Sequence, residues 1–172
     1  MPLARFLAGL ALAGLLHLAG TRVTPYFPLA IDLFLLTAIL EARHGRPLGG
    51  MLAGLAAGLA ADGLSGGPYG LFGFADTAVG FGVARAAQQL VVQRTTSLAA
   101  IFAAGAAAQQ AILAALSLVF RPEGELPGFE WLLARVASTA LLGLAWTRAV
   151  ELLFARFASR RAGREKQLKI DA

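Results

Sequence analysis

Three aspartates stand in or at the ends of long apolar segments, where a charged side chain is costly. Asp32, Asp62 and Asp76 lie in runs with few other charges, and Arg135 lies in a later apolar run. Ionisable groups in segments of this kind are expensive, and they usually have a function. Arg135 is the expected counter-ion for the carboxylates. These four residues predict a polar pocket, and its chemistry would be to hold an ion or a small polar ligand.

Asp62 has a second interpretation, which we favour for this residue. It ends an apolar run and precedes the stretch GLSGGPYG, residues 63–70. Aspartates at such positions commonly accept hydrogen bonds from loop amides. Gly66 and Gly70 permit positive φ, and Pro68 fixes a turn. We therefore expect Asp62 to shape this loop, and we expect Asp62→Asn to keep most of the acceptor capacity.

No constellation for catalysis or metal binding is visible in the sequence. The chain has no cysteine, and its two histidines, His17 and His44, fall in different segments. Neither a phosphate-cradling GxxxxGK loop nor an HExxH pair occurs. The net charge of +5 reflects six cations in the last 17 residues, so it does not indicate nucleic-acid binding. The sequence predicts a protein that is not an enzyme and has no cofactor.

The elements that must position these residues are apolar helices. Of the 172 residues, 58% are hydrophobic and 15% are charged, which is typical of an all-α, polytopic membrane protein. We expect a single six-helix transmembrane domain at 1–155 and a basic cytoplasmic tail at 156–172. The first apolar segment is interpreted as a retained helix and not as a signal peptide. The six predicted spans are 3–20, 27–42, 47–62, 71–91, 97–119 and 129–154.

Loop charges predict the orientation of these spans. Arg43 and Arg46 join spans two and three, Arg94 joins spans four and five, and the tail is basic. The alternate loops are neutral at 63–70 and acidic at 121–130. Positively charged loops face the cytoplasm. Both termini are therefore predicted to be cytoplasmic, with the three aspartates in the outer third of the membrane and the polar pocket open to the outer face.

Small residues recur every four positions in span three, at Gly50, Gly54 and Gly58. Such stripes let two helix backbones approach closely in lipid. Span five has a comparable set, which consists of Ala103, Ala104, Ala107, Ala108 and Ala111. We expect both stripes to pack against helices of the same chain, and a partner helix docking there is the alternative.

Residues 27 to 74 contain a characteristic order of motifs. A Pro and an Asp enter the second span, a basic loop follows, and a Gly-rich third span ends in Gly-x-x-x-Asp before a Ser-Gly-x-x-Gly loop. The positions are Pro28, Asp32, Gly54, Gly58, Asp62, Ser65, Gly66 and Gly70. This order resembles the MreD family of rod-shape-determining membrane proteins, which has an Asp or Asn at the second of these positions. The chain departs from the family pattern at Phe72–Phe74, and Asp76 is not a family residue.

The resemblance implies a component of the bacterial elongation machinery (the elongasome) that controls cell shape and lateral peptidoglycan synthesis. Its partners would be an MreC-like protein, RodA, a penicillin-binding transpeptidase, the MreB filament and membrane lipid, in the inner membrane. The family fold is similar to the substrate-binding subunits of energy-coupling-factor vitamin transporters. That similarity provides the alternative function, a membrane-embedded solute-binding subunit of such a transporter.

Overall fold

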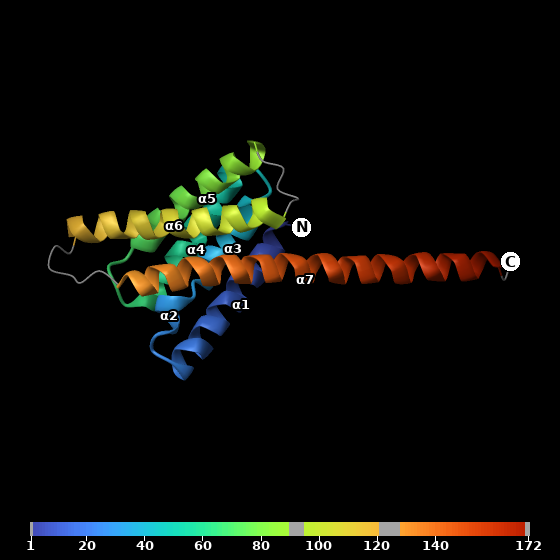
Figure 1. The fold of residues 1–172 in the computed structure, drawn as a ribbon, viewed down its shortest axis with the longest axis horizontal. Helices are drawn as coiled ribbons and strands as arrows, with labels where there is room; N and C mark the ends of the chain where they lie inside the picture. The colour runs from blue at the N-terminus through green and yellow to red at the C-terminus, as the bar shows by residue number, and fades with distance from the viewer. Residues whose placement is uncertain (1, 90–94, 121–127, 171–172) are drawn as a thin grey trace.

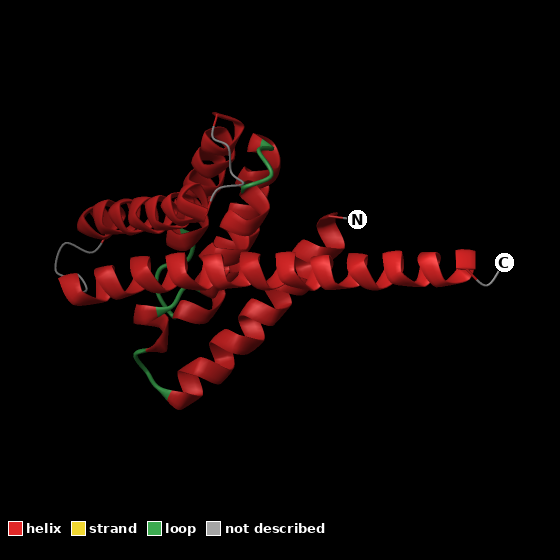
Figure 2. Ribbon diagram, turned by 45° about the vertical axis from the view of Figure 1, so that its right-hand side comes forward, coloured by secondary structure: helices red, strands yellow, loops and turns green. Residues whose placement is uncertain are grey.

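The computed structural model describes residues 2–89, 95–120 and 128–170, and these residues form helices joined by loops. Figure 2 shows no strand in this part of the chain. The predicted all-α class is therefore confirmed. Three segments are long and apolar enough to cross a membrane, namely Leu3–Val23, Pro47–Ser65 and Thr96–Phe120. These segments indicate a membrane protein, and six crossings stay a prediction.

Each predicted span corresponds to helical structure, with differences at the ends. Span three is longer than expected because α4 continues to Ser65 and stops at Gly66, which is left-handed with φ 65°. The loops at 90–94 and 121–127, which contain Arg94 and most of the acidic stretch, lie outside the described residues. The elements are α1 (Pro2–Val23), α2 (Phe27–Ala30), α3 (Leu33–Ala42), α4 (Pro47–Ser65), α5 (Leu71–Gln89), α6 (Thr95–Phe120) and α7 (Phe129–Ile170).

The second predicted span is not one continuous helix. It is divided into α2 and α3 by Ile31 and Asp32, whose backbones are extended. Asp32 is the N-cap of α3, and its Oδ1 accepts a hydrogen bond from the Leu35 amide at 2.9 Å. An N-cap aspartate satisfies an amide at the start of a helix that would otherwise lack a partner. The sequence thus predicts Asp32 about one turn inside a helix, whereas in the structure its carboxylate caps the start of α3.

The glycine stripe of α4 packs against α5 within the same chain, as expected. A Cβ built on Gly54 would lie 2.6 Å from the Asp76 carbonyl carbon, and one on Gly58 would lie 2.5 Å from that of Phe72. Those distances are shorter than van der Waals contact, and backbone atoms, unlike the end of a flexible side chain, cannot move to relieve the overlap. The two helices therefore touch through their backbones, which fixes how Asp76 is presented to the rest of the bundle.

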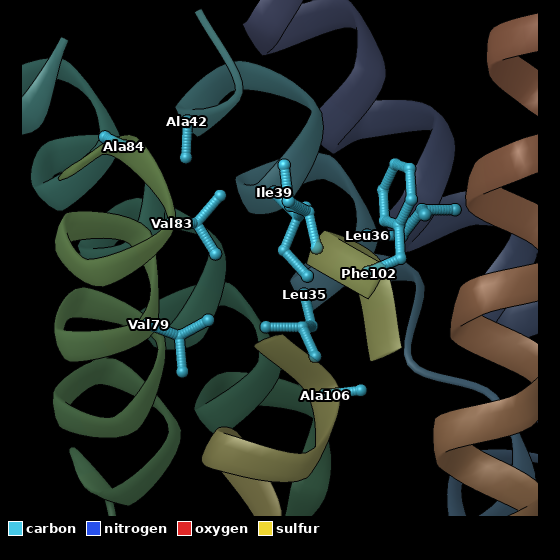
Figure 3. Packing of buried hydrophobic residues seen from close by; sticks show 10 residues of the cluster. Leu35, Leu36, Ile39, Ala42, Val79, Val83, Ala84, Phe102 and Ala106 are labelled. Atoms are coloured by element: carbon cyan, nitrogen blue, oxygen red, sulfur yellow. The ribbon is translucent and has the colours of Figure 1, made fainter. Parts of the chain in front are cut away.

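The short helix α3 lies at the centre of the bundle and contacts α1, α4, α5, α6 and α7. Leu35 and Ile39 are completely buried, and they pack against Val79 and Val83 of α5 and Phe102 of α6. Figure 3 shows these side chains converging from the three helices. Because α3 is enclosed on all sides, its N-terminal Asp32 is enclosed as well.

The face that α6 turns inward is not the predicted alanine stripe. Ile101, Phe102, Ala106 and Gln109 are buried, whereas Ala104, Ala107, Ala108 and Ala111 are exposed. The larger side chains fill the space between α3, α5 and α7, because alanines there would leave cavities. Packing within the chain was the wrong expectation for this stripe.

Helix α7 runs beside α6 and then projects well beyond the other helices (Figure 1). Its backbone is helical as far as Ile170, so the basic segment predicted as a tail at 156–172 continues the last helix over most of its length. The side chains of this extension lie outside the described set.

Candidate functional site: a buried polar cluster

Four side chains form what we call the polar cluster: Asp32, Asp76, Gln109 and Arg135. They come from the N-cap of α3, from α5, from α6 and from α7. Arg135 forms an ion pair with Asp32 through its Nη2 atom. The sequence proposed Arg135 as counter-ion, and the structure brings it to Asp32 and not to Asp76.

Gln109 joins the two carboxylates. Its Nε2 atom donates to Asp32 Oδ2 at 2.8 Å and to Asp76 Oδ1 at 2.7 Å. Its Oε1 atom accepts a hydrogen bond from Gln110 Nε2 at 3.1 Å. Both amide hydrogens and the carbonyl are therefore in use, as a buried amide requires. Gln109 is completely buried, and it ties α3, α5 and α6 together.

The polar cluster is closed, and not the open pocket that the sequence predicts. Asp32 is 5% exposed and Asp76 is 0% exposed. The chain encloses these carboxylates because α3 is central and α4 meets α5 at backbone distance. What the cluster shows directly is a polar connection between four segments, and such connections are strong in an apolar interior.

Some buried polar side-chain atoms in and beside the polar cluster have no hydrogen-bond partner among the described residues. They are Asp76 Oδ2, Arg135 Nε and Thr139 Oγ1. An unsatisfied buried polar atom costs about 1–3 kcal/mol, and more when the group is charged. Thr139 follows Arg135 by one helical turn, so both lie on the same face of α7. The cluster is thus incompletely paired on the side of Asp76 and α7.

Arg135 and its neighbour Ser138 hold the start of α7 against the α2–α3 break. The Arg135 guanidinium lies over the Phe72 ring, 5.4 Å from its centroid. The Ser138 hydroxyl donates to the Ala30 carbonyl, which has no helical partner where α2 ends. His17 of α1 lies nearby and packs against the Phe34 ring at 5.5 Å between centroids. Within the described part of the chain, His17 makes no hydrogen bond to the cluster.

Asp62 is separate from the polar cluster and organises the loop after α4. Its Oδ2 atom accepts from the amides of Gly70 at 3.0 Å and Gly73 at 2.9 Å. Its Oδ1 atom accepts from the Phe72 amide at 3.0 Å. These amides begin α5 and have no helical acceptor. Asp62 is only 2% exposed, and the hydrogen bonds expected from the sequence are present.

The remaining motif positions have structural roles around the same two sites. Pro28 lies in the first turn of α2, where a missing amide hydrogen is harmless. Ser65 Oγ donates to the Asp62 carbonyl at 3.1 Å and accepts from Gly67. Gly66 and Gly70 have φ of 65° and 101°, which other residues rarely adopt.

Gln109 is the cluster residue that sequence reasoning undervalued. A glutamine in the middle of an apolar helix predicts a hydrogen bond between helices and no more, yet Gln109 is the centre of the network. An available signal was its place in α6, where the described residues include no titratable side chain and Gln109–Gln110 interrupts an alanine-rich run. The partners of such a residue could not be found without the fold.

No metal site accompanies the cluster. Within residues 2–89, 95–120 and 128–170, no group of three His, Asp or Glu side chains could hold a metal ion. An apolar groove of about 350 Å³ lies between α5 and α6, and its lining contains none of the four cluster residues.

Comparison with family models, curated proteins and solved structures found no match to this chain.

Proposed function

We propose that this chain is a non-enzymatic membrane component of the bacterial cell-elongation machinery. In this proposal it resides in the inner membrane and works beside an MreC-like protein, RodA, a penicillin-binding transpeptidase and the MreB filament. Its role is to scaffold these proteins during lateral wall synthesis. The proposal extends the resemblance to the MreD family.

The observation that carries the proposal is the arrangement around Asp62. The Gly-rich helix α4 ends in this aspartate, whose carboxylate accepts three amides from the start of α5. The motif residues thus support a rigid connection between α4 and α5. Tyr69 stands at its tip, 72% exposed, so the loop offers a fixed surface to a partner. A scaffold needs a surface of this kind.

Six membrane crossings with both termini in the cytoplasm form part of the proposal. Arg43 and Arg46 flank the connection from α3 to α4 at one end of the bundle. Tyr26 and Trp131 stack at the opposite end, with ring centroids 5.5 Å apart. Basic residues favour the cytoplasmic interface, and Tyr and Trp favour both interfaces. We also propose that the helices adopt a fold similar to the energy-coupling-factor substrate-binding subunits.

The alternative, capture of a small solute, has less support from the site. A solute-binding subunit needs polar groups around a cavity that opens outward. Asp32, Asp62 and Asp76 are instead at most 5% exposed and bond to other parts of this chain. The groove between α5 and α6 is apolar. We therefore prefer the scaffold.

Photocrosslinking in living cells tests the proposed contact. A photoreactive amino acid at Tyr69 should crosslink to an MreC-like protein or another elongation component. The same amino acid at Tyr26, which is 59% exposed in a different loop, is the matched control. Crosslinks from Tyr69 to the subunits of a transport ATPase, with none to elongation proteins, would contradict the proposal.

A further inference from the structure

Asp76 differs from the other buried carboxylates in its pairing. Asp32 has a guanidinium partner, and Asp62 has three amide partners. Asp76 has one hydrogen bond, from Gln109 to Oδ1, and its Oδ2 has no partner in the part of the chain that is described. Asp76 is also the only one of the three with no exposed surface at all.

The charges around Asp76 do not balance if it is ionised. The helices packed against α5 are α3, α4 and α6. Helix α3 carries Asp32 at its N-cap, α4 carries Asp62, and α6 carries the neutral Gln109. Arg135 comes from α7. Arg135 is committed to Asp32. An ionised Asp76 would therefore leave an unpaired negative charge among apolar side chains, which is strongly unfavourable.

We propose that Asp76 is a proton-binding site, occupied in the folded bundle, with the proton on Oδ2. The hydrogen bonds select this oxygen, because Gln109 donates to Oδ1 and thereby marks it as the carbonyl oxygen. The Gln109 amide is consistent with this assignment, since its second hydrogen is used by Asp32 and its oxygen by Gln110. Loss of the proton would place a net charge between α3, α5 and α6.

The consequence is a bundle whose stability depends on pH. In this inference the folded state keeps the Asp76 proton at a pH where the unfolded state has lost it. The free energy of unfolding therefore decreases as pH rises. This dependence should disappear when the carboxyl is replaced by a neutral amide of the same shape. The inference does not depend on the proposed function, since it concerns stability and not cell shape.

Thermal unfolding of the full chain in lipid nanodiscs tests the inference. Between about pH 5 and about pH 9, the unfolding midpoint of the unaltered protein should fall by at least about 5 °C. Asp76→Asn should remove most of this fall. Glu41→Gln, a matched carboxyl-to-amide change at the other end of α3, should leave it in place. An equal fall in Asp76→Asn and the unaltered protein would overturn the inference.

Two further measurements use only the unaltered protein, so they decide the matter even if Asp76→Asn does not fold. Infrared spectroscopy should detect the carbonyl stretch of a buried protonated carboxyl group, and this band should be lost on raising the pH. Its absence at every pH would overturn the inference. Replacing choline by sodium at high pH should leave the unfolding midpoint unchanged, and stabilisation by sodium would show an alkali-metal site instead.

Discussion

Asp62 uses both carboxylate oxygens, and this changes what an amide substitution should do. Oδ2 accepts two amides and Oδ1 accepts a third. An asparagine has a single acceptor oxygen, so its NH₂ group would face at least one amide hydrogen. The expectation from sequence that Asp62→Asn would keep most of the acceptor capacity therefore does not fit this geometry.

We expect Asp62→Asn to lower stability by about 1–3 kcal/mol and Asp62→Ala by more, because the alanine leaves every one of these amides unpaired. Thermal unfolding in nanodiscs measures both variants. Ser65→Ala, which removes the two longer hydrogen bonds of Ser65 Oγ with the Asp62 carbonyl and the Gly67 amide, is the control and should be mild. Full stability of Asp62→Ala would show that water satisfies the loop amides.

Gln109 provides a second test at the scale of single residues. Gln109→Leu keeps the volume but removes the donors to Asp32 and Asp76, and we expect a loss of about 2–4 kcal/mol. Gln110→Leu is the matched control, because the part-buried Gln110 side chain bonds, among the described residues, only to Gln109. Equal unfolding midpoints for the two variants would mean that the network does not hold the helices together.

At the scale of elements, the contact between α4 and α5 depends on glycine at particular positions. Gly54 and Gly63 both lie in α4, but a Cβ on Gly54 would strike the Asp76 backbone, whereas one on Gly63 would meet nothing within 4 Å. The close approach is what allows α5 to present Asp76 to Gln109. Steric room, and not helix propensity, separates the two sites.

Gly54→Ala should therefore destabilise the protein by about 1–3 kcal/mol through overpacking. Gly63→Ala should be neutral or stabilising by up to about 1 kcal/mol, since alanine favours helix. Unfolding of the two variants in parallel isolates the packing effect. If Gly54→Ala were as stable as Gly63→Ala, the inference that α4 and α5 touch through their backbones at Gly54 would be wrong.

The sequence predicts some of these elements well because their signals are local. Long apolar runs locate the helices, and the Gly50–Gly54–Gly58 spacing identifies the face that meets α5. The break at Asp32 was missed because an apolar run of 27–42 contains no signal for an extended residue, while the Asp32 side chain that caps α3 could equally lie within a helix. Which face of α6 turns inward depends on the shapes of α3 and α7, which no local pattern contains.

The candidate site shows the same division. Asp32, Asp76 and Arg135 were identified because charges are conspicuous in apolar segments. Arg135 was also identified as their counter-ion, but its choice of Asp32 over Asp76 was not predicted, since that choice depends on the register of segments from α3, α5, α6 and α7. Asp62 was placed correctly in its loop because its partners follow 8 to 11 residues later, across one short connection.

At the scale of the whole molecule, the distribution of charge predicts orientation. Reporters fused after Ala172 and inserted at Arg46 should both report cytoplasm, and one at Gly124 should report the outside, because basic segments are retained in the cytoplasm. Activity of paired reporters that work on opposite sides of the membrane measures this. An external C-terminus would contradict six crossings.

The central claim is that this chain supports cell elongation, and cell shape measures it most directly. Depleting the protein in the bacterium that encodes it should turn rods into spheres, and the unaltered chain should restore rods. Asp62→Ala, expressed at a matched level, should fail to do so, whereas Gly63→Ala should succeed. Depleted cells that stay rod-shaped, and that resume growth only when a vitamin is supplied in excess, would contradict the claim and favour solute capture.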